Sequence, residues 1–563
     1  MWLPNLPAAV LCALLCANFR PSCAGTLNKA SGILTVKVEN KSYFSVVAAK
    51  LSIAILVCAA AISAPATDLD TIGVTLLRQV DPTLDGSGVS VAQAEGEDIF
   101  TPNSAFPFEV SPVPVGQPLA LFTWFSISNT AGAGTFPNNA GTESFHADSV
   151  GGNFYGIPFG VATNVSHVDN YEADYFFNSK IAPGAAIPAA VVNQSFNFDP
   201  SDQAVADPAY DNYAVMRKTI FITGAGNGGP IVSNSPATTF NGIAVGVYPG
   251  SSSFGPTSDG RSKPDIASPG SGVTSFSSPY VSGAAAILLQ AARCGDGGVG
   301  TSVATNLIAI KAFLLNGAVK PADWTNGITT PLDARYGAGI LNVFNSWHQL
   351  RSGLHALIES TTVGSGAAHP PGANTGNESS LTGWDYNTVS ALSSQDIASH
   401  YYFNLTGSNF FTLTATLVWN RPPNKSSVNN LDLFLYNTSN GALVLSSTSA
   451  VDNVEHLFLP QLAPGRYDLQ VLKRGSSQVS NGETYALAFE FFSMKLNIVL
   501  TGGNFVLSWT NAPTGFRLVS APSLNPPVSW TSVNAISVGL NTGQSVVTVP
   551  ASGTSQFFRL QRP

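Results

Sequence analysis

Charged side chains are scarce in this chain of 563 residues. Lys, Arg, Asp and Glu together make up 10% of it, against roughly 25% in an average soluble protein. The formal net charge is −8, and no basic run occurs, which argues against nucleic-acid binding because that requires clustered Lys and Arg. Hydrophobic residues reach 44%, so the composition is not that of a disordered chain. The length predicts about three or four domains.

Cysteine is scarce as well, and it is unevenly placed. Of the five cysteines, four lie near the N-terminus (Cys12, Cys16, Cys23 and Cys58), and only Cys294 follows them. A single cysteine cannot form an internal disulfide, so core packing must stabilise the rest of the chain.

Long apolar runs are also missing, but a short one carries a targeting signal. Residues 51–66 (LSIAILVCAAAISAPA) follow Lys50 and end in a small-residue pattern typical of a secretory signal peptide. We expect cleavage after Ala66, so that residues 1–66 are removed and the mature chain begins at Thr67. The run is too short for an ordinary membrane span. The expected location is therefore extracellular or periplasmic with no stable membrane anchor, and an uncleaved anchor or a buried helix is the alternative.

The region of residues 67–350 alternates between two kinds of segment. Short β-rich runs end in Gly, Asn or Ser, and longer segments between them have helical spacing, such as residues 171–178 and 284–292. The β-rich runs lie at 89–92, 190–192, 219–223 and 243–245. This alternation predicts an α/β domain whose parallel, doubly wound sheet is connected by crossover helices.

The pattern changes after this domain. Gly, Ala and Pro gather within residues 351–384, which we interpret as a linker. In residues 385–493 helical spacing disappears and alternating, β-branched runs predict a β-sandwich. Residues 494–563 predict a small C-terminal β module.

Four segments of the α/β region carry side chains suited to catalysis. A predicted buried strand ends in Glu95, and His146 begins a helix of small residues. A glycine-rich turn presents the amide of Asn227. Ser275 lies at a helix start, with Pro279 in about the first turn, where helix N–H groups favour negative charge.

These segments supply the functions that a serine nucleophile requires. A nearby His takes the proton of the serine, a carboxylate orients that His, and hydrogen-bond donors stabilise the oxyanion. The chain order of acid, His and Ser is one of the known orders for such triads.

In these motifs, residues 86–345 resemble the subtilisin-like serine proteases, or subtilases, of secreted bacterial type. The segment that begins at His146 agrees with the family pattern H-G-T-H-V-A-G-x-x-x-G at four positions: His146, Val150, Gly152 and Gly156. The segment of Ser275 agrees with the G-T-S-x-[AS]-x-P-x-V-x-G helix at Ser275, Pro279, Val281 and Gly283. Residues 417–467 resemble the jelly-roll domain that follows some bacterial subtilases.

The resemblance implies a subtilisin-like fold and a serine endopeptidase acting on proteins or peptides. Ser275 would be the nucleophile, His146 the general base, Glu95 the acid and Asn227 the oxyanion donor. The family has Asp at position 95, so Asp98 is a second candidate for the acid. No cofactor is needed for this chemistry.

Two other functions stay open. Glu95 and Val273 depart from the family's Asp and Gly, so the chain could instead be a catalytically inactive binding protein whose β modules attach it to a surface or polymer. A sedolisin-type Ser-Glu-Asp site could use the acids of residues 167–174, although we place that segment on the surface. The six histidines other than His146 are interpreted as ordinary: His167, His348, His355, His369, His400 and His456.

Metal binding is the remaining question. Structural calcium is frequent in subtilases, and Asp432, Asp452 and Glu455 are acids of a kind that calcium binds. We interpret these three as solvated loop acids and assign no metal ligands.

Overall fold

The computed structural model describes a defined part of the chain: residues 67–97, 107–250, 252–298, 301–372, 376–390, 392–476, 479–493, 495–510, 517–524, 529–533, 537–541, 544–551 and 556–561. The predicted signal peptide and Asp98 lie outside these residues. The described chain begins at Thr67, which caps α3 (Asp68–Thr71) and leads to α4 (Val74–Val80).

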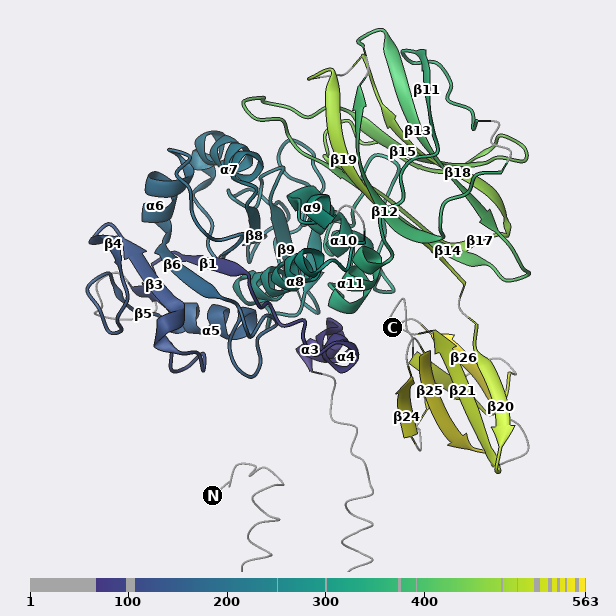
Figure 1. Ribbon diagram of the computed structural model, residues 1–563, viewed down its shortest axis with the longest axis horizontal. Coiled ribbons are helices and arrows are strands. Elements are labelled where there is room, and N and C mark those ends of the chain that lie inside the picture. Colours follow the sequence, from purple (N-terminus) through teal and green to yellow (C-terminus); the bar gives the residue numbers. More distant parts are fainter. Residues whose placement is uncertain are drawn as a thin grey trace, which may run out of the picture. The chain divides into compact units, whose positions relative to one another are not determined.

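A mostly parallel sheet forms the centre of the α/β region (Figure 1). Its described strands follow the order β10-β9-β8-β7-β1-β6-β3-β4, and only the pair of β3 and β4 is antiparallel. The strands are β1 (Ser90–Glu95), β3 (Phe122–Ser126), β4 (Asn129–Ala133), β6 (His167–Glu172), β7 (Val191–Gln194), β8 (Ile220–Gly224), β9 (Ile243–Val247) and β10 (Ile266–Ser268). A separate pair joins β2 (Pro107–Glu109) to β5 (Thr142–Glu143). This confirms the predicted parallel sheet.

Strand β1 lies where the strand order reverses. It pairs with β6 on one side and with β7 on the other, both in parallel. In open α/β sheets, sites form outside the carboxyl ends of the strands at such a reversal. Glu95, the last residue of β1, is therefore at the position where this fold class places its chemistry.

Helices cover the sheet and connect its strands. The longest, α8 (Thr274–Cys294), is buried along most of its length, because its many Ser, Gly and Ala residues permit close packing on the strands. The others are α5 (Phe145–Phe154), α6 (Ala173–Phe176), α7 (Gln203–Arg217), α9 (Thr301–Ala304), α10 (Leu307–Asn316) and α11 (Val343–Arg351), with short turns η1 (Leu119–Leu121), η2 (Phe177–Ile181) and η3 (Pro200–Asp202). Among the described residues, no helix combines the length and apolar character that a membrane crossing requires.

One helix prediction was wrong in part. Residues 171–178 were expected to be helical, but β6 continues to Glu172 and α6 begins only at Ala173. The surface position predicted for residues 167–174 was also wrong for most of the segment, although Asp174 is exposed. Strand β6 lies between β1 and β3, and it is buried after its first residue.

Antiparallel sheets follow the α/β region, as predicted. A five-stranded sheet contains β11 (Glu359–Gly364), β13 (Gln395–Leu405), β18 (Gly465–Lys473), β15 (Leu431–Asn437) and β16 (Leu443–Ser447). A four-stranded sheet contains β12 (Thr382–Ser390), β19 (Gly482–Phe492), β14 (Phe411–Trp419) and β17 (Val454–Leu462). The two sheets share one apolar core, to which Leu413 and Leu433 contribute from opposite sheets. We call residues 359–492 the double-sheet region.

The predicted linker is shorter than expected. Strand β11 lies inside residues 351–384 and pairs with β13, because its backbone completes the edge of the five-stranded sheet. The last part of the chain forms further antiparallel sheets with a small core around Leu507, Leu518 and Val547. Its strands are β20 (Asn497–Thr501), β21 (Asn504–Thr510), β22 (Arg517–Ala521), β23 (Thr531–Ser532), β24 (Ser537–Asn541), β25 (Gln544–Pro550) and β26 (Phe557–Gln561).

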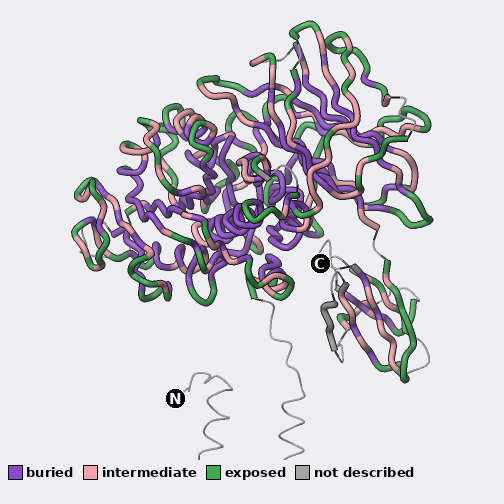
Figure 2. The backbone as a smooth tube through the Cα atoms, in the orientation of Figure 1, coloured by how far each residue is buried: buried purple, intermediate pink, exposed green. Residues whose placement is uncertain are grey.

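The core of the α/β region continues into the double-sheet region. Helix α10 is buried at every residue and packs on β14 and β19. Trp384 of β12 meets Phe313 of α10 with ring centroids 5.3 Å apart. Figure 2 shows buried residues running from the helices into these strands. The two regions therefore share one hydrophobic core.

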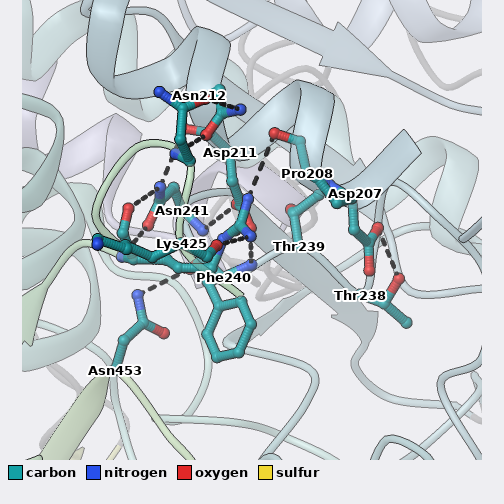
Figure 3. Close-up of polar contacts among 12 residues, drawn as sticks. Asp207, Pro208, Asp211, Asn212, Thr238, Thr239, Phe240, Asn241, Lys425 and Asn453 are labelled. Atoms are coloured by element: carbon teal, nitrogen blue, oxygen red, sulfur yellow. Dashed lines mark hydrogen bonds and ion pairs between the residues drawn. The ribbon is translucent and has the colours of Figure 1, made fainter. Parts of the chain in front are cut away.

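A polar network also joins these regions (Figure 3). Arg421 Nε lies 2.9 Å from Asp211 Oδ2 of α7, and both side chains are buried. The Asn241 amide pairs with the backbone of Arg421 in both directions, accepting from its N–H at 2.8 Å and donating to its carbonyl at 3.2 Å. Asn453 Nδ2 donates to the Phe240 carbonyl at 2.9 Å. The contact face is thus both apolar and specifically hydrogen-bonded.

Candidate active site

Glu95 and His146 meet at the carboxyl end of β1. Glu95 Oε2 lies 2.8 Å from His146 Nδ1. The Glu95 side chain is 1% exposed and that of His146 is 29% exposed. A buried carboxylate therefore holds one imidazole nitrogen, while the ring keeps access to solvent and substrate.

Helix α5 sets the position of His146. Ser144 is the N-cap, and its hydroxyl accepts the N–H of Ala147 at 3.2 Å. His146 consequently lies in the first turn, and the small residues behind it allow α5 to pack against α8. Asn153 Nδ2 of α5 donates to the Phe276 carbonyl of α8 at 3.0 Å.

Asn227 is fixed at the start of α8. Its Oδ1 accepts the Thr274 N–H at 2.7 Å and the Thr274 hydroxyl at 3.0 Å. These two donors determine which end of the carboxamide is oxygen. The Nδ2 end, which is a donor, is the other end of the same carboxamide and is not the end bonded to Thr274.

The turn that carries Asn227 depends on Gly226. Its φ of +107° lies in the left-handed region, and an added Cβ would come within 2.8 Å of Ser253 Oγ. The Gly226 N–H also donates to Thr274 Oγ1 at 3.2 Å. Hydrogen bonds to Thr274 therefore hold this turn against the start of α8.

Ser275 is the second residue of α8, among the N–H groups that have no partner four residues back. Its hydroxyl donates to the Ser195 carbonyl at 3.5 Å, and Ser195 Oγ donates to the Ser275 carbonyl at 2.9 Å. Pro279 is the sixth helix residue rather than part of the first turn, so it lacks the N–H that would otherwise reach the Ser275 carbonyl. The Ser195 hydroxyl supplies a donor there.

An apolar cleft of about 350 Å³ opens beside these residues. The ring of Phe276 lies 5.7 Å from that of His146 and contributes to the wall. Phe145 and Phe159, also in the wall, are 78% and 74% exposed. Two large exposed rings next to a reactive imidazole form a surface suited to an apolar side chain.

Two further acids near the site have raised pKa values. Burial raises the pKa of Asp148 to about 7, and the neighbouring carboxyls of Glu143 and Glu95 add to the effect. Burial likewise raises the pKa of Glu109 to about 7. The Asp148 carboxyl accepts the Ser111 N–H at 2.7 Å, so it fixes the loop after β2.

The sequence interpretation missed Gln93. Its side chain is fully buried, and Nε2 donates to Glu95 Oε1 at 2.8 Å. A signal existed, since a Gln interrupts the otherwise apolar run of β1 two residues before the acid. Side chains two apart on a strand point to the same face.

Two acids of the sedolisin alternative, Asp169 and Glu172, have other partners in this geometry. The Glu172 carboxylate caps α6, accepting the N–H groups of Asp174 at 2.8 Å and Tyr175 at 2.7 Å. Asp169 lies 3.2 Å from His167. Both carboxylates thus have partners other than Ser275.

The interpretation of three acids as solvated loop residues was wrong. Asp432 is 2% exposed and bonds Arg474, Asp452 is 5% exposed and accepts the Ser262 N–H, and Glu455 is fully buried against Ser447 and Ser449. All three acids therefore lie in the interior with hydrogen-bond partners in the protein, and Asp452 and Glu455 share Ser449 as a partner. Within the described residues, no cluster of three or more His, Cys, Asp or Glu side chains is arranged to bind a metal ion.

Comparisons with known proteins point to one family. Residues 160–339 match the model of the subtilase family (Peptidase_S8), a range that includes Asn227 and Ser275 and begins after Glu95 and His146. A serine protease/ABC transporter B family protein (tagD) of Dictyostelium discoideum is 28% identical over an alignment covering 35% of this chain and 13% of that protein. The chain thus spans a small part of this curated relative.

Solved structures were matched as well. The self-cleaved protease domain of PatA is 21% identical, with a TM-score of 0.34, and the match covers 48% of this chain and 99% of that one. The psychrophilic subtilisin-like protease Apa1 of Pseudoalteromonas sp. AS-11 is 12% identical, with a TM-score of 0.33 and coverages of 51% and 97%.

Proposed function

Starting from the subtilase-family domain with its subtilisin-like α/β fold, which indicates a serine protease, we propose that this chain is an exported serine endopeptidase. Ser275 is the nucleophile, His146 the general base, and Glu95 the carboxylate that orients His146. Protein or peptide chains are the substrates, and the chemistry uses side chains alone.

The proposed reaction begins at Ser275. Its hydroxyl turns from the Ser195 carbonyl toward His146 Nε2, gives up its proton, and attacks the scissile carbonyl carbon. Geometry without substrate is commonly looser than in the reacting complex. The carbonyl oxygen becomes an oxyanion, which Asn227 Nδ2 and the Ser275 N–H stabilise.

The second half of the reaction runs through an acyl-enzyme. His146 passes its proton to the leaving amine, the C–N bond breaks, and the substrate's carbonyl part stays bonded to Ser275 Oγ. Water then attacks this ester while His146 takes a proton from it, the bond from the acyl carbon to Ser275 Oγ breaks, Oγ regains the proton from His146, and the carboxylic acid product leaves. The Glu95 carboxylate stabilises the imidazolium that forms in each half.

The observation that carries the proposal is the 2.8 Å contact of Glu95 with His146 Nδ1. It leaves Nε2 as the basic nitrogen, and it shows that the longer acid at position 95 can reach the imidazole. The position of Glu95 at the end of β1 supports it over Asp98.

The location and the C-terminal part belong to the same proposal. Export rests on the signal sequence at residues 51–66 with cleavage after Ala66. After that cleavage, we propose a secreted or periplasmic protein without a membrane anchor. In this proposal the C-terminal β modules, residues 385–563, attach the protein to a surface or polymer.

A fluorophosphonate probe tests the catalytic part, because it bonds covalently only to an activated serine. The full chain should be labelled, and Ser275→Ala should not be. Ser282→Ala is a matched control from the same helix, since its hydroxyl faces Asn193 of β7 instead. Folded wild type that stays unlabelled would refute the proposal and favour a catalytically inactive binding protein.

A further inference from the structure

Gln93 forms a bridge between the strand that carries the acid and the helix that carries the histidine. Its Nε2 donates to Glu95 Oε1 at 2.8 Å and to the Ala147 carbonyl at 2.9 Å. Ala147 directly follows His146. One amide therefore contacts both the carboxylate and the backbone next to the imidazole.

The amide is itself held in a single orientation. The Tyr155 hydroxyl donates to Gln93 Oε1 at 2.6 Å, and both side chains are fully buried. Gly151 leaves the room for this pair, since an added Cβ would lie 2.9 Å from Tyr155 Oη and 3.2 Å from Gln93 Oε1. With its oxygen bonded to Tyr155, the amide must present its NH₂ to Glu95 and Ala147.

A Glu at position 95 creates a need for such a bridge. Its side chain has one more rotatable bond than Asp, so its carboxylate can sample more positions in front of His146. The two oxygens of Glu95 have separate partners, with Oε1 bonded to Gln93 and Oε2 to His146. Fixing Oε1 selects the rotamer in which Oε2 reaches Nδ1.

We propose that Gln93 is a positioning residue that holds Glu95, and through it His146, in reactive geometry. This inference rests on the proposed function for its kinetic consequences. Gln93 does not touch the reacting atoms, so its removal should lower kcat and leave KM nearly unchanged.

The kinetic test replaces Gln93 with Met, which has similar volume but no amide. Because small misplacements of catalytic groups can cost about 100-fold in rate, we expect Gln93→Met to slow fluorophosphonate labelling by about 10–100-fold. Gln194→Met is the matched control. Gln194 is also fully buried, lies beside Ala94 in the next strand, and bonds a tyrosine hydroxyl, that of Tyr210, at 2.7 Å.

A double variant separates positioning from general support of the fold. In Glu95→Asp the side chain is one methylene shorter, so its carboxylate cannot contact Gln93 and His146 in the same way. Adding Gln93→Met to Glu95→Asp should therefore reduce the labelling rate by a much smaller factor than adding it to wild type, because the effects of coupled residues are not additive. Equal costs in the two backgrounds would overturn the inference.

A spectroscopic readout does not depend on activity. The Nδ1 proton of an imidazole bonded to a carboxylate appears in proton NMR far downfield of backbone amides, and His146→Ala assigns the signal. This signal should be present in wild type and Gln194→Met and be lost in Gln93→Met. His400, which lies 2.8 Å from Asp468 in the double-sheet region with both side chains buried, gives a reference that should remain in every variant.

Probe labelling and proton NMR test the proposed function and the role of Gln93 separately. Unlabelled wild type would end the proposed function, while the NMR signal would still decide the role of Gln93. Absence of the signal in wild type, its persistence in Gln93→Met, or unchanged labelling of Gln93→Met beside an active wild type would each overturn the inference.

Discussion

Replacing Arg421 with Met should weaken the junction between the α/β region and the double-sheet region. The change keeps much of the side-chain volume but leaves Asp211 without its cation. Asp211 is 1% exposed and Arg421 is 5% exposed. The Asn241 N–H, which donates to Asp211 at 2.7 Å, would remain as a partner.

The expected cost follows from the burial of this pair. Removing one partner of a buried ion pair typically costs about 3–5 kcal/mol, because the other charge stays in the interior uncompensated. Burial already raises the pKa of Asp211 despite the opposing effect of Arg421. Without Arg421 this pKa must rise further, and Asp211 can become neutral by binding a proton.

The loss of unfolding free energy in Arg421→Met must therefore depend on pH. An acid whose folded-state pKa lies above its unfolded value destabilises the fold at high pH, and the penalty disappears as pH falls through the folded pKa. Each pH unit below that pKa recovers up to about 1.4 kcal/mol. We expect the full loss at pH 8 and a much smaller loss at pH 5.

Urea unfolding of wild type and Arg421→Met at pH 8 and pH 5 measures this difference in unfolding free energy. The double variant Arg421→Met with Asp211→Asn is the control, since Asn keeps an acceptor for the Asn241 N–H without the charge. The double variant should recover more than half of the unfolding free energy that Arg421→Met loses at pH 8. A loss below about 1 kcal/mol at pH 8, far under the range for buried pairs, or an equal loss at both pH values, would refute the reasoning.

Three further predictions concern the site. Asn227→Ala should lower kcat by about 10²–10³-fold, a magnitude that comes from subtilisin itself rather than from this geometry; unchanged turnover would exclude Asn227 as the oxyanion donor. Since burial raises the pKa values of Glu109 and Asp148 to about 7, the folded state holds protons that the unfolded state releases, so stability should rise as pH falls from 8 to 5. Urea midpoints measure this, and a fall in stability over that range would contradict it. Phe276→Ala should raise KM most for peptides with a large apolar residue on the leaving-group side, because the proposed mechanism has His146 protonate the leaving amine and Phe276 lies next to His146 and lines the cleft. An equal effect on small-residue peptides would contradict this prediction.

The fold was predictable where local patterns are strong. Apolar runs bounded by Gly, Asn or Ser became parallel strands, and the small-residue segment at 284–292 became part of α8. The surface position predicted for residues 167–174 was wrong for β6, whose polar residues after His167 are buried. Their burial depends on β1 and β3 on either side, which no local pattern reveals.

The site was predictable to the extent that its residues lie in motifs. Glu95 ends a strand, Asn227 follows one, and His146 and Ser275 lie in the first turns of helices. Gln93 was missed because its importance depends on Tyr155, 62 positions away in the chain. Side-chain bonds between distant segments leave little trace in a single sequence.

The shared core of α10 with β14 and β19 has a consequence for biosynthesis. A ribosome delivers the chain from its N-terminus, so Ser275 and His146 emerge long before the strand that ends at Phe492. Until that strand arrives, one side of α10 lacks its cover and the α/β region cannot finish packing. The proposed protease would thus complete its packing only after the chain up to Phe492 has been made, well after the nucleophile itself.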